Sequence, residues 1–170
     1  MSKEERINPI WPSQIVDELK FELDRDLNCE DPMIVAALDV WDQARGNRDM
    51  PSRKDLDPLT MPPSLLQHVL LVDVEHQPQL RFRWRLIGTH ITTRLGRDST
   101  GRYWDELYSP AVYEAMSLSV HWVIRERRPL RSLGFAPVEE RKHLASESVD
   151  LPLSEDGKEI TMIMIASVYK

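Results

Sequence analysis

The chain has 170 residues, a formal net charge of −6 at pH 7 and one cysteine, Cys29. This length suits a single domain with an appended segment, and one cysteine excludes an internal disulfide framework and a multi-cysteine metal site. The negative charge argues against a general nucleic-acid binder. The start of the chain lacks the apolar core of a signal peptide, and no apolar run approaches the roughly 20 residues that span a bilayer. We therefore expect a soluble cytoplasmic protein that neither binds nucleic acid nor inserts into a membrane.

Residues 1–30 are predicted to form an acidic helical arm. The first 31 residues hold nine acidic and four basic side chains, so most of the net charge lies there. Ser13 after a proline suits a helix N-cap. Apolar residues then recur at every fourth position, which is the spacing of one helix face: Ile15, Leu19, Leu23 and Leu27.

A second helix is predicted to open at Asp31, because this residue is an N-cap type and a proline follows it at the first helical position. The helix should end at Gly46-Asn47. Its apolar side carries Ile34, Ala37, Leu38 and Trp41. Prolines then interrupt the chain until about residue 64.

The next segment is predicted to be an antiparallel hairpin of strands 70–75 and 81–88. In the second strand apolar and arginine side chains alternate, which places one face on a core and leaves the other charged. Between residues 81 and 102 six arginines face a single aspartate. The acidic arm and this basic segment invite pairing within one molecule or between two, and the alternative is two separate solvated faces.

The remainder is predicted to contain short helical pieces, a long helix from Pro110 to about Arg127, and strands at 130–136, 143–153 and 159–169. The last strand is apolar on both faces, which suits the centre of a sheet. The expected fold class is α+β: a five-stranded antiparallel sheet with helices crossing one face, preceded by the N-terminal helices.

This order of two strands, a helical middle and three strands resembles a PAS domain. The likeness extends to successive blocks of a PAS-like family of small proteobacterial proteins, and it covers roughly residues 35–170. The blocks are VWDQARGNRDMPSRKDLDP, LLVDV, RFRWRLIGTHI, LGRDSTGRYWDEL, RRPL and VDLPLSEDGKEITMIMIASVYK. We therefore divide the chain into the arm at 1–30 and a PAS-like domain at 31–170. The resemblance implies a sensory or protein-interaction module and supplies no catalytic residues.

A ligand cavity is expected between the concave sheet and the helical middle, because such cavities combine apolar walls with a few polar groups. The alternative is that the aromatic side chains simply fill the core. The candidate ligand-binding residues are Phe82, Trp84, His90, Tyr103, Trp104, Tyr108, His121, Trp122 and Phe135, and Ser146 is a further polar candidate.

The sequence identifies no cofactor. The five histidines have no metal-ligand spacing, and His121 is the one mildly attractive axial ligand for a haem. Cys29 lies between the two N-terminal helices, outside the expected cavity, which argues against cysteinyl–flavin chemistry. The sequence does not exclude a flavin that binds without a covalent bond.

The leading hypothesis is a stand-alone sensory or adaptor module without catalytic activity. It would bind a small apolar molecule inside or a signalling partner outside, and it would form a homodimer through the N-terminal helix and the sheet face. One alternative is a small cavity enzyme of isomerase or dehydratase type, with its acid–base groups drawn from Asp73, His90, Tyr103 and His121. Another is a purely structural interaction protein.

Overall fold

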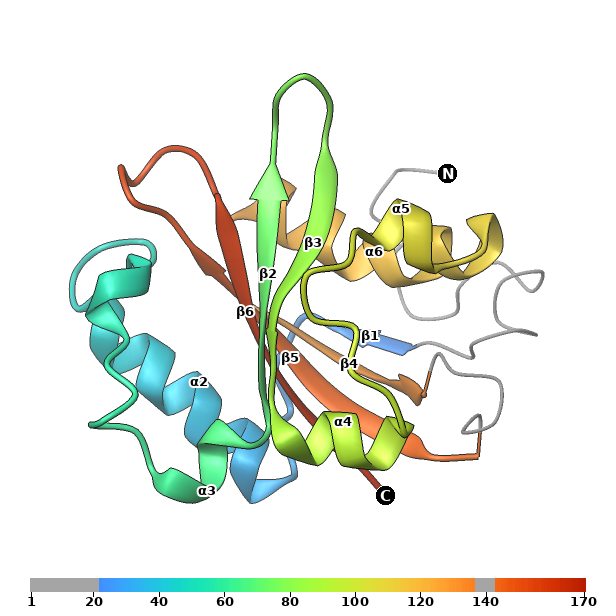
Figure 1. Ribbon diagram of the computed structural model, residues 1–170. Helices are drawn as coiled ribbons and strands as arrows, with labels where there is room; N and C mark the ends of the chain where they lie inside the picture. The colour runs from blue at the N-terminus through green and yellow to red at the C-terminus, as the bar shows by residue number, and fades with distance from the viewer. Residues whose placement is uncertain (1–21, 137–142) are drawn as a thin grey trace.

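The computed structural model describes residues 22–136 and 143–170, which form a six-stranded antiparallel sheet covered by helices (Figure 1). The strand order is β1-β4-β5-β6-β2-β3. The five predicted strands are confirmed, and a sixth strand, β1, extends the sheet. The bounds are β1 (Glu22–Asp24), β2 (Val69–Glu75), β3 (Arg81–Ile87), β4 (Leu130–Phe135), β5 (Ala145–Leu153) and β6 (Met162–Tyr169).

Helices lie on both sides of this sheet (Figure 1). The helices between β3 and β4 share one face, as predicted: α4 (Thr89–Leu95), α5 (Trp104–Leu107) and α6 (Pro110–Glu126). The other face carries the elements that precede the hairpin: α2 (Pro32–Arg45), the 3₁₀ helix η1 (Arg53–Asp55) and α3 (Pro63–Leu66). Among the described residues, no helix is both long and apolar enough to cross a membrane.

Local sequence signals place the two main helices where they were predicted. The Asp31 side chain accepts a hydrogen bond from the backbone N–H of Met33 at 2.9 Å and caps α2. Gly46, with a φ of +59°, ends it, because a left-handed turn favours glycine. Helix α6 begins at Pro110 behind the N-cap Ser109, and both helices use a proline in the first turn.

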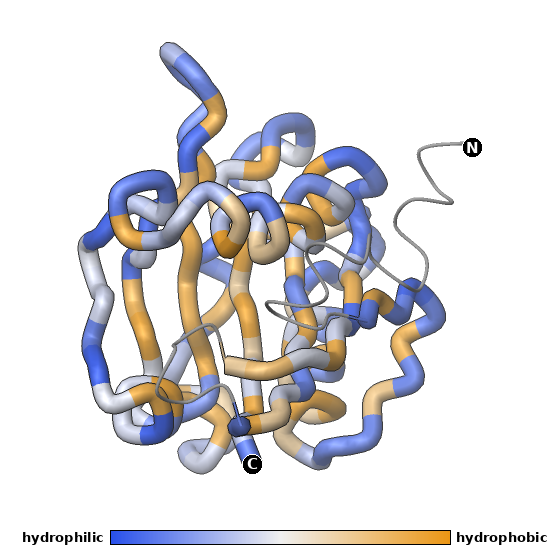
Figure 2. Tube along the Cα trace, turned by 90° about the vertical axis from the view of Figure 1, so that its right-hand side faces the viewer, coloured by the Kyte–Doolittle hydropathy of each residue, from blue (hydrophilic) through white to orange (hydrophobic). Residues whose placement is uncertain are grey.

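Helices cover both faces of the sheet, and every residue of β6 after Met162 is buried, which confirms the prediction that the last strand lies at the centre of the sheet. In β6, Ile165 faces α4–α6, whereas Met164 faces the opposite side. Trp41 of α2 reaches the same opposite side, where its Nε1–H donates to the Pro152 carbonyl oxygen at 2.8 Å. Figure 2 shows the hydrophobic residues concentrated along the strands, with hydrophilic residues at the surrounding turns.

The predicted helix of the N-terminal arm is wrong over residues 22–27. Residues 22–24 instead form β1 on the free edge of β4, with Leu23 opposite Ser132. Leu23 is buried by this pairing, and Leu27 has a φ of +57°, which a helix does not allow. The four-residue spacing between Leu23 and Leu27 therefore does not indicate a helix here: Leu23 lies in β1, and Leu27 lies beyond the turn that follows it. The rest of the predicted arm lies outside the described residues.

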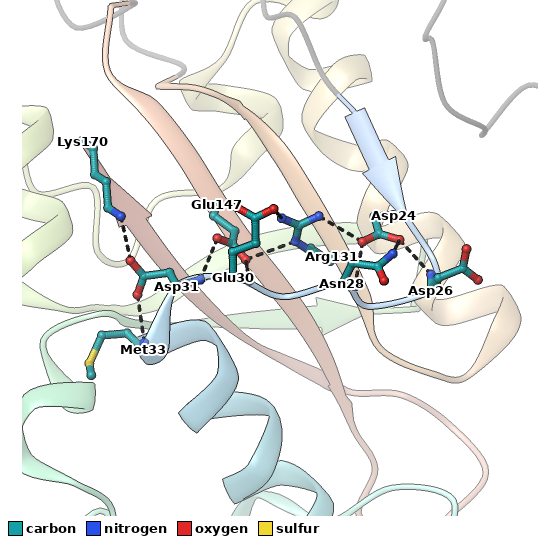
Figure 3. A network of polar contacts seen from close by, with 9 residues as sticks. All are labelled: Asp24, Asp26, Asn28, Glu30, Asp31, Met33, Arg131, Glu147 and Lys170. Atoms are coloured by element: carbon teal, nitrogen blue, oxygen red, sulfur yellow. Dashed lines mark hydrogen bonds and ion pairs between the residues drawn. The ribbon is translucent and has the colours of Figure 1, made fainter.

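A buried arginine of β4, Arg131, ties this N-terminal segment to the sheet (Figure 3). Its guanidinium lies 3.0 Å from Asp24 and 3.1 Å from Glu147, and Glu30 is 3.9 Å away. The Glu147 carboxylate also accepts hydrogen bonds from the backbone N–H groups of Glu30 and Asp31, at 2.9 and 3.1 Å. We call Asp24, Glu30, Asp31, Arg131, Glu147 and Lys170 the Arg131 network, since Lys170 completes it by pairing with Asp31 at 3.0 Å.

These contacts stabilise the ionised form of Asp24. Burial alone would raise its pKa, but hydrogen bonds from the Asn28 and Asp26 backbone and from Arg131 outweigh burial and hold the pKa below its usual value.

Within one molecule, the described acids near the N-terminus do not pair with the arginines of the hairpin, whereas pairing between two molecules stays a prediction. Arg81 pairs with Asp105 at 2.7 Å, and Arg83 pairs with Asp73 at 2.8 Å. These carboxylates are the nearest partners for the two arginines, because Asp73 lies in the same hairpin and Asp105 lies in the adjacent α5. Asp24 and Asp31 pair with Arg131 and Lys170 instead.

Replacing Arg131 by methionine should lower the free energy of unfolding by about 3 kcal/mol, because two nearly buried carboxylates lose their partner. The matched control is Arg85→Met, whose side chain is 56% exposed and 3.7 Å from Asp73. That change should cost less than about 0.5 kcal/mol. Urea denaturation of the two variants measures the difference, and equal midpoints would show that the network does not stabilise the fold.

Candidate functional site

A cavity of about 90 Å³ lies between the sheet and helices α4, α5 and α6. It is partly open to solvent, and most of its lining is apolar. The aromatic lining comes from β3, α5 and the ends of neighbouring elements: Trp84, Trp104, Tyr108, Phe135 and Tyr169. Most of the polar lining comes from α6 and from the sheet, namely Ser119, Ser132, Ser146, Ser148, Asp150 and Ser167, and the loop after α4 adds Arg97 and Ser99.

The aromatic side chains support one another. The rings of Trp84 and Trp104 lie 4.9 Å apart between centroids, and Tyr108 meets Trp104 edge-on at 6.3 Å. The Nε1–H of Trp84 donates to the Tyr108 hydroxyl at 3.0 Å. Burial raises the pKa of Tyr108 to about 12, so this phenol stays neutral. These contacts hold Trp84 and Tyr108 in place at the cavity.

The polar lining follows from the two-residue period of a strand. Ser146, Ser148 and Asp150 alternate along β5, so all three point to the face that carries α4–α6. Ser148 also pairs with Ser167 of β6, with 2.6 Å between the two hydroxyl oxygens. The result is a band of short polar side chains across the centre of the sheet, opposite the aromatic rings.

Asp150 is the most unusual member of this band. Its side chain is 3% exposed, and its Oδ2 has no hydrogen-bond partner among the described residues. Burial raises the pKa of this carboxyl to about 6, and Ser119 partly opposes the rise by hydrogen bonding. The group therefore titrates close to neutrality inside a mostly apolar cavity.

Trp104 supplies a second unpaired polar atom. Its side chain is 1% exposed, and its Nε1 has no acceptor within the part of the chain that the structure describes. An indole N–H can only donate a hydrogen bond, whereas an ionised carboxylate can only accept one. Two residues of the cavity lining thus carry an unpaired donor and an unpaired acceptor.

The structure brings four of the nine predicted ligand-binding residues to the cavity: Trp84, Trp104, Tyr108 and Phe135. Phe82 lies behind the cavity, where it packs on Trp104 with 5.2 Å between ring centroids. Trp122 is buried and stacks under the Arg128 guanidinium at 5.2 Å. These two side chains fill the core, as the alternative interpretation held for the whole aromatic set.

The remaining three candidates have other partners. Tyr103 donates its hydroxyl to Glu75 at 2.6 Å and lies under the Arg81 guanidinium at 3.8 Å. His90 stacks on His68 at 4.1 Å, and its Nε2 accepts the backbone N–H of Tyr169 at 3.2 Å. His121 lies on the exposed side of α6, 5.5 Å from the Phe82 ring. None of the three lines the cavity.

The groups considered for an enzyme do not converge at the cavity either. Asp73 forms its ion pair with Arg83, and His90, Tyr103 and His121 lie elsewhere as described. The single cysteine, Cys29, is half-buried near the Arg131 network and does not line the cavity. Among the described residues, no group of three or more His, Cys, Asp or Glu side chains could hold a metal ion.

Sequence reasoning named four of the five aromatic residues that line the cavity and missed most of its polar residues. Ser146 was a candidate, whereas Ser148, Asp150 and Ser167 were not. The signal was present in residues 146–150, where Ser146, Ser148 and Asp150 occupy every second position of a predicted strand. Polar groups on the covered face of a central strand point to a cavity, because a packed core would not retain them.

A family model described as PAS domain matches residues 30–165, which is most of the chain. No curated protein and no solved structure matches it.

Replacing Asp150 by asparagine should change how stability depends on pH. The folded-state pKa of about 6 exceeds the ordinary value of 3.8, so this group contributes stability that is complete below pH 3.8 and lost as the pH rises through 6. Wild type should therefore lose about 1 kcal/mol more than Asp150→Asn between pH 5 and pH 7.5.

Chemical denaturation at the two pH values measures this difference. Asp105→Asn is the control, because hydrogen bonds from Arg81 hold the pKa of Asp105 below its usual value, and its stabilising effect does not change above pH 5. Parallel pH profiles for wild type and Asp150→Asn would contradict a raised pKa at this site.

Proposed function

This chain belongs to the PAS domain family, and from that premise we propose that it is a sensory module whose cavity binds a small molecule. Binding would shift the population of conformations that a partner recognises. PAS domains are typically sensory modules rather than enzymes, which supports a signalling role in general terms.

The observation that carries the proposal is the pair of unpaired polar atoms at one cavity. A buried polar group without a partner costs about 1–3 kcal/mol. Asp150 and Trp104 both bear such an atom, and both line the space between the sheet and α5. A side chain selected only to fill the core would avoid this cost, so a ligand that satisfies both atoms accounts for their retention.

The strands that form the polar side of the cavity offer a route to the surface. Ser132 and Ser148 face the cavity from β4 and β5, whereas their neighbours Arg131 and Glu147 point to the opposite face and hold the N-terminal segment. A ligand that displaces β4 or β5 would therefore also displace the Arg131 network. We propose that a protein partner or a second copy of the chain responds to that change.

A catalytic role finds less support. An enzyme of this size would need acid and base groups converging in one dry cavity. The histidines and Tyr103 considered for that role are engaged elsewhere, and Asp150 is the carboxyl group at the cavity. Its free oxygen and its aromatic surroundings favour binding.

Filling the cavity should abolish ligand binding without unfolding the domain. Ser132→Leu adds bulk at a buried position of the lining, and Ser64→Leu adds the same atoms at an exposed position of α3. A thermal-shift screen of small metabolites on the full chain should yield ligands that raise the melting temperature of wild type and of Ser64→Leu by several degrees. Ser132→Leu should not respond to them.

Native mass spectrometry of the purified protein gives an independent measurement. Ligands that stabilise Ser132→Leu as strongly as wild type would place binding outside the cavity. The proposal fails if no compound shifts the wild-type transition and no bound molecule is detected.

A further inference from the structure

We infer that the ligand is a small organic amine that also carries an oxygen acceptor, with its ammonium group on Asp150 and its oxygen on the Trp104 indole N–H. The inference rests on the proposed function, because it assigns the chemistry of the ligand in the same cavity. Four features lead to it: a buried carboxylate, a wall of aromatic rings, an unpaired indole donor and the volume of the cavity.

The carboxylate requires a positive partner. Asp150 is fully enclosed, its Oδ2 is unpaired, and no basic side chain among the described residues perturbs its ionisation. Arg131 belongs to a neighbouring strand but points to the opposite face of the sheet, where Asp24 and Glu147 occupy it. Buried charges in proteins are normally paired, so an ammonium group on the bound molecule would supply the partner that the ionised form of Asp150 lacks.

The aromatic wall favours the same charge. Trp84, Trp104 and Tyr108 line the space opposite the polar band, and the faces of aromatic rings attract cations. An anionic ligand would meet the Asp150 carboxylate and the electron-rich rings together. Arg97 also lines the cavity, but its side chain is exposed at the edge of the site, where water and salt screen its charge.

The unpaired indole donor adds an acceptor to the ligand. Trp104 Nε1 can only donate, so an ammonium group cannot satisfy it. A hydroxyl or carbonyl oxygen on the same molecule can. One ligand with a nitrogen donor and an oxygen acceptor would therefore satisfy both unpaired atoms of the cavity.

The volume limits the size of the ligand. An engineered protein cavity of about 150 Å³ holds one benzene molecule. The present cavity measures about 90 Å³, so it suits a molecule of about four or five non-hydrogen atoms. Amino alcohols of the size of ethanolamine meet this limit.

The test uses three probes of equal heavy-atom count: ethanolamine, n-propylamine and 1-propanol. Each is titrated into the ¹⁵N-labelled full chain at pH 7.5, and the indole N–H signal of Trp104, assigned with Trp104→Phe, reports on the site. Ethanolamine should bind at least tenfold more tightly than 1-propanol and should move the Trp104 indole signal. The oxygen-free n-propylamine should bind with intermediate affinity and should shift this signal less.

Asp150→Asn removes the charge and keeps the shape. It should weaken ethanolamine binding at least tenfold and leave 1-propanol binding within about twofold. Asp105→Asn, which removes a carboxylate that pairs with Arg81 outside the cavity, is the control and should retain the preference for ethanolamine. Lowering the pH from 7.5 to 5 should weaken ethanolamine binding to wild type about tenfold, because the Asp150 carboxyl becomes protonated.

Two results would overturn the inference. One is that 1-propanol binds wild type as tightly as ethanolamine, or loses as much affinity as ethanolamine in Asp150→Asn. The cavity would then bind ligands irrespective of their charge, and the sensory proposal would stand. The other is that none of the three probes binds. In that case the metabolite screen decides the sensory proposal separately, since an uncharged or acidic ligand found there would support it.

Discussion

Both faces of the sheet are covered, and this constraint gives the two sides of β5 different tasks. Val149, Leu151 and Leu153 are fully buried on the side of α2. The opposite side presents Ser146, Ser148 and Asp150 to the helices α4–α6. Serine side chains are too short to fill the space up to the aromatic rings, so a cavity remains where leucines would have closed it. Short side chains on one face of β5, together with Ser132 of β4 and Ser167 of β6, thus leave room for the cavity.

Side chains that alternate between the two faces of β4 and β5 link the cavity directly to the Arg131 network on the opposite face of the sheet. Arg131 and Ser132 are adjacent on β4 and point to opposite faces, and Glu147 and Ser148 are related in the same way on β5. A strand moves as a unit, so a shift that alters the cavity lining also alters the Arg131 network. That network holds the segment from β1 to the start of α2, which is where the described part of the chain begins (Figure 3).

Elements with strong local signals could be predicted from the sequence, and elements that depend on distant partners could not. Asp31, Pro32 and Gly46 encode the ends of α2 locally, and the two-residue period encodes β3. Strand β1 was missed because only the free edge of β4, more than a hundred residues away, makes extended backbone favourable at Leu23. His90 was misplaced for a similar reason, since its partners His68 and Tyr169 come from other elements.

The wall formed by α4 limits what the cavity can accept. The backbone N–H groups of Gly88 and His90 donate to the carbonyl oxygens of Val69 and Gln67 at 2.8 and 2.9 Å. A Cβ at Gly88 would lie 2.3 Å from the Gln67 oxygen, so only glycine allows this close approach. The imidazole of His90 accepts the N–H of Tyr169 and joins α4 to β6 as well. Because these hydrogen bonds hold α4 to β2 and β6, widening the cavity on that side would break them. A large planar cofactor would have to break these contacts, whereas a compact polar ligand would not.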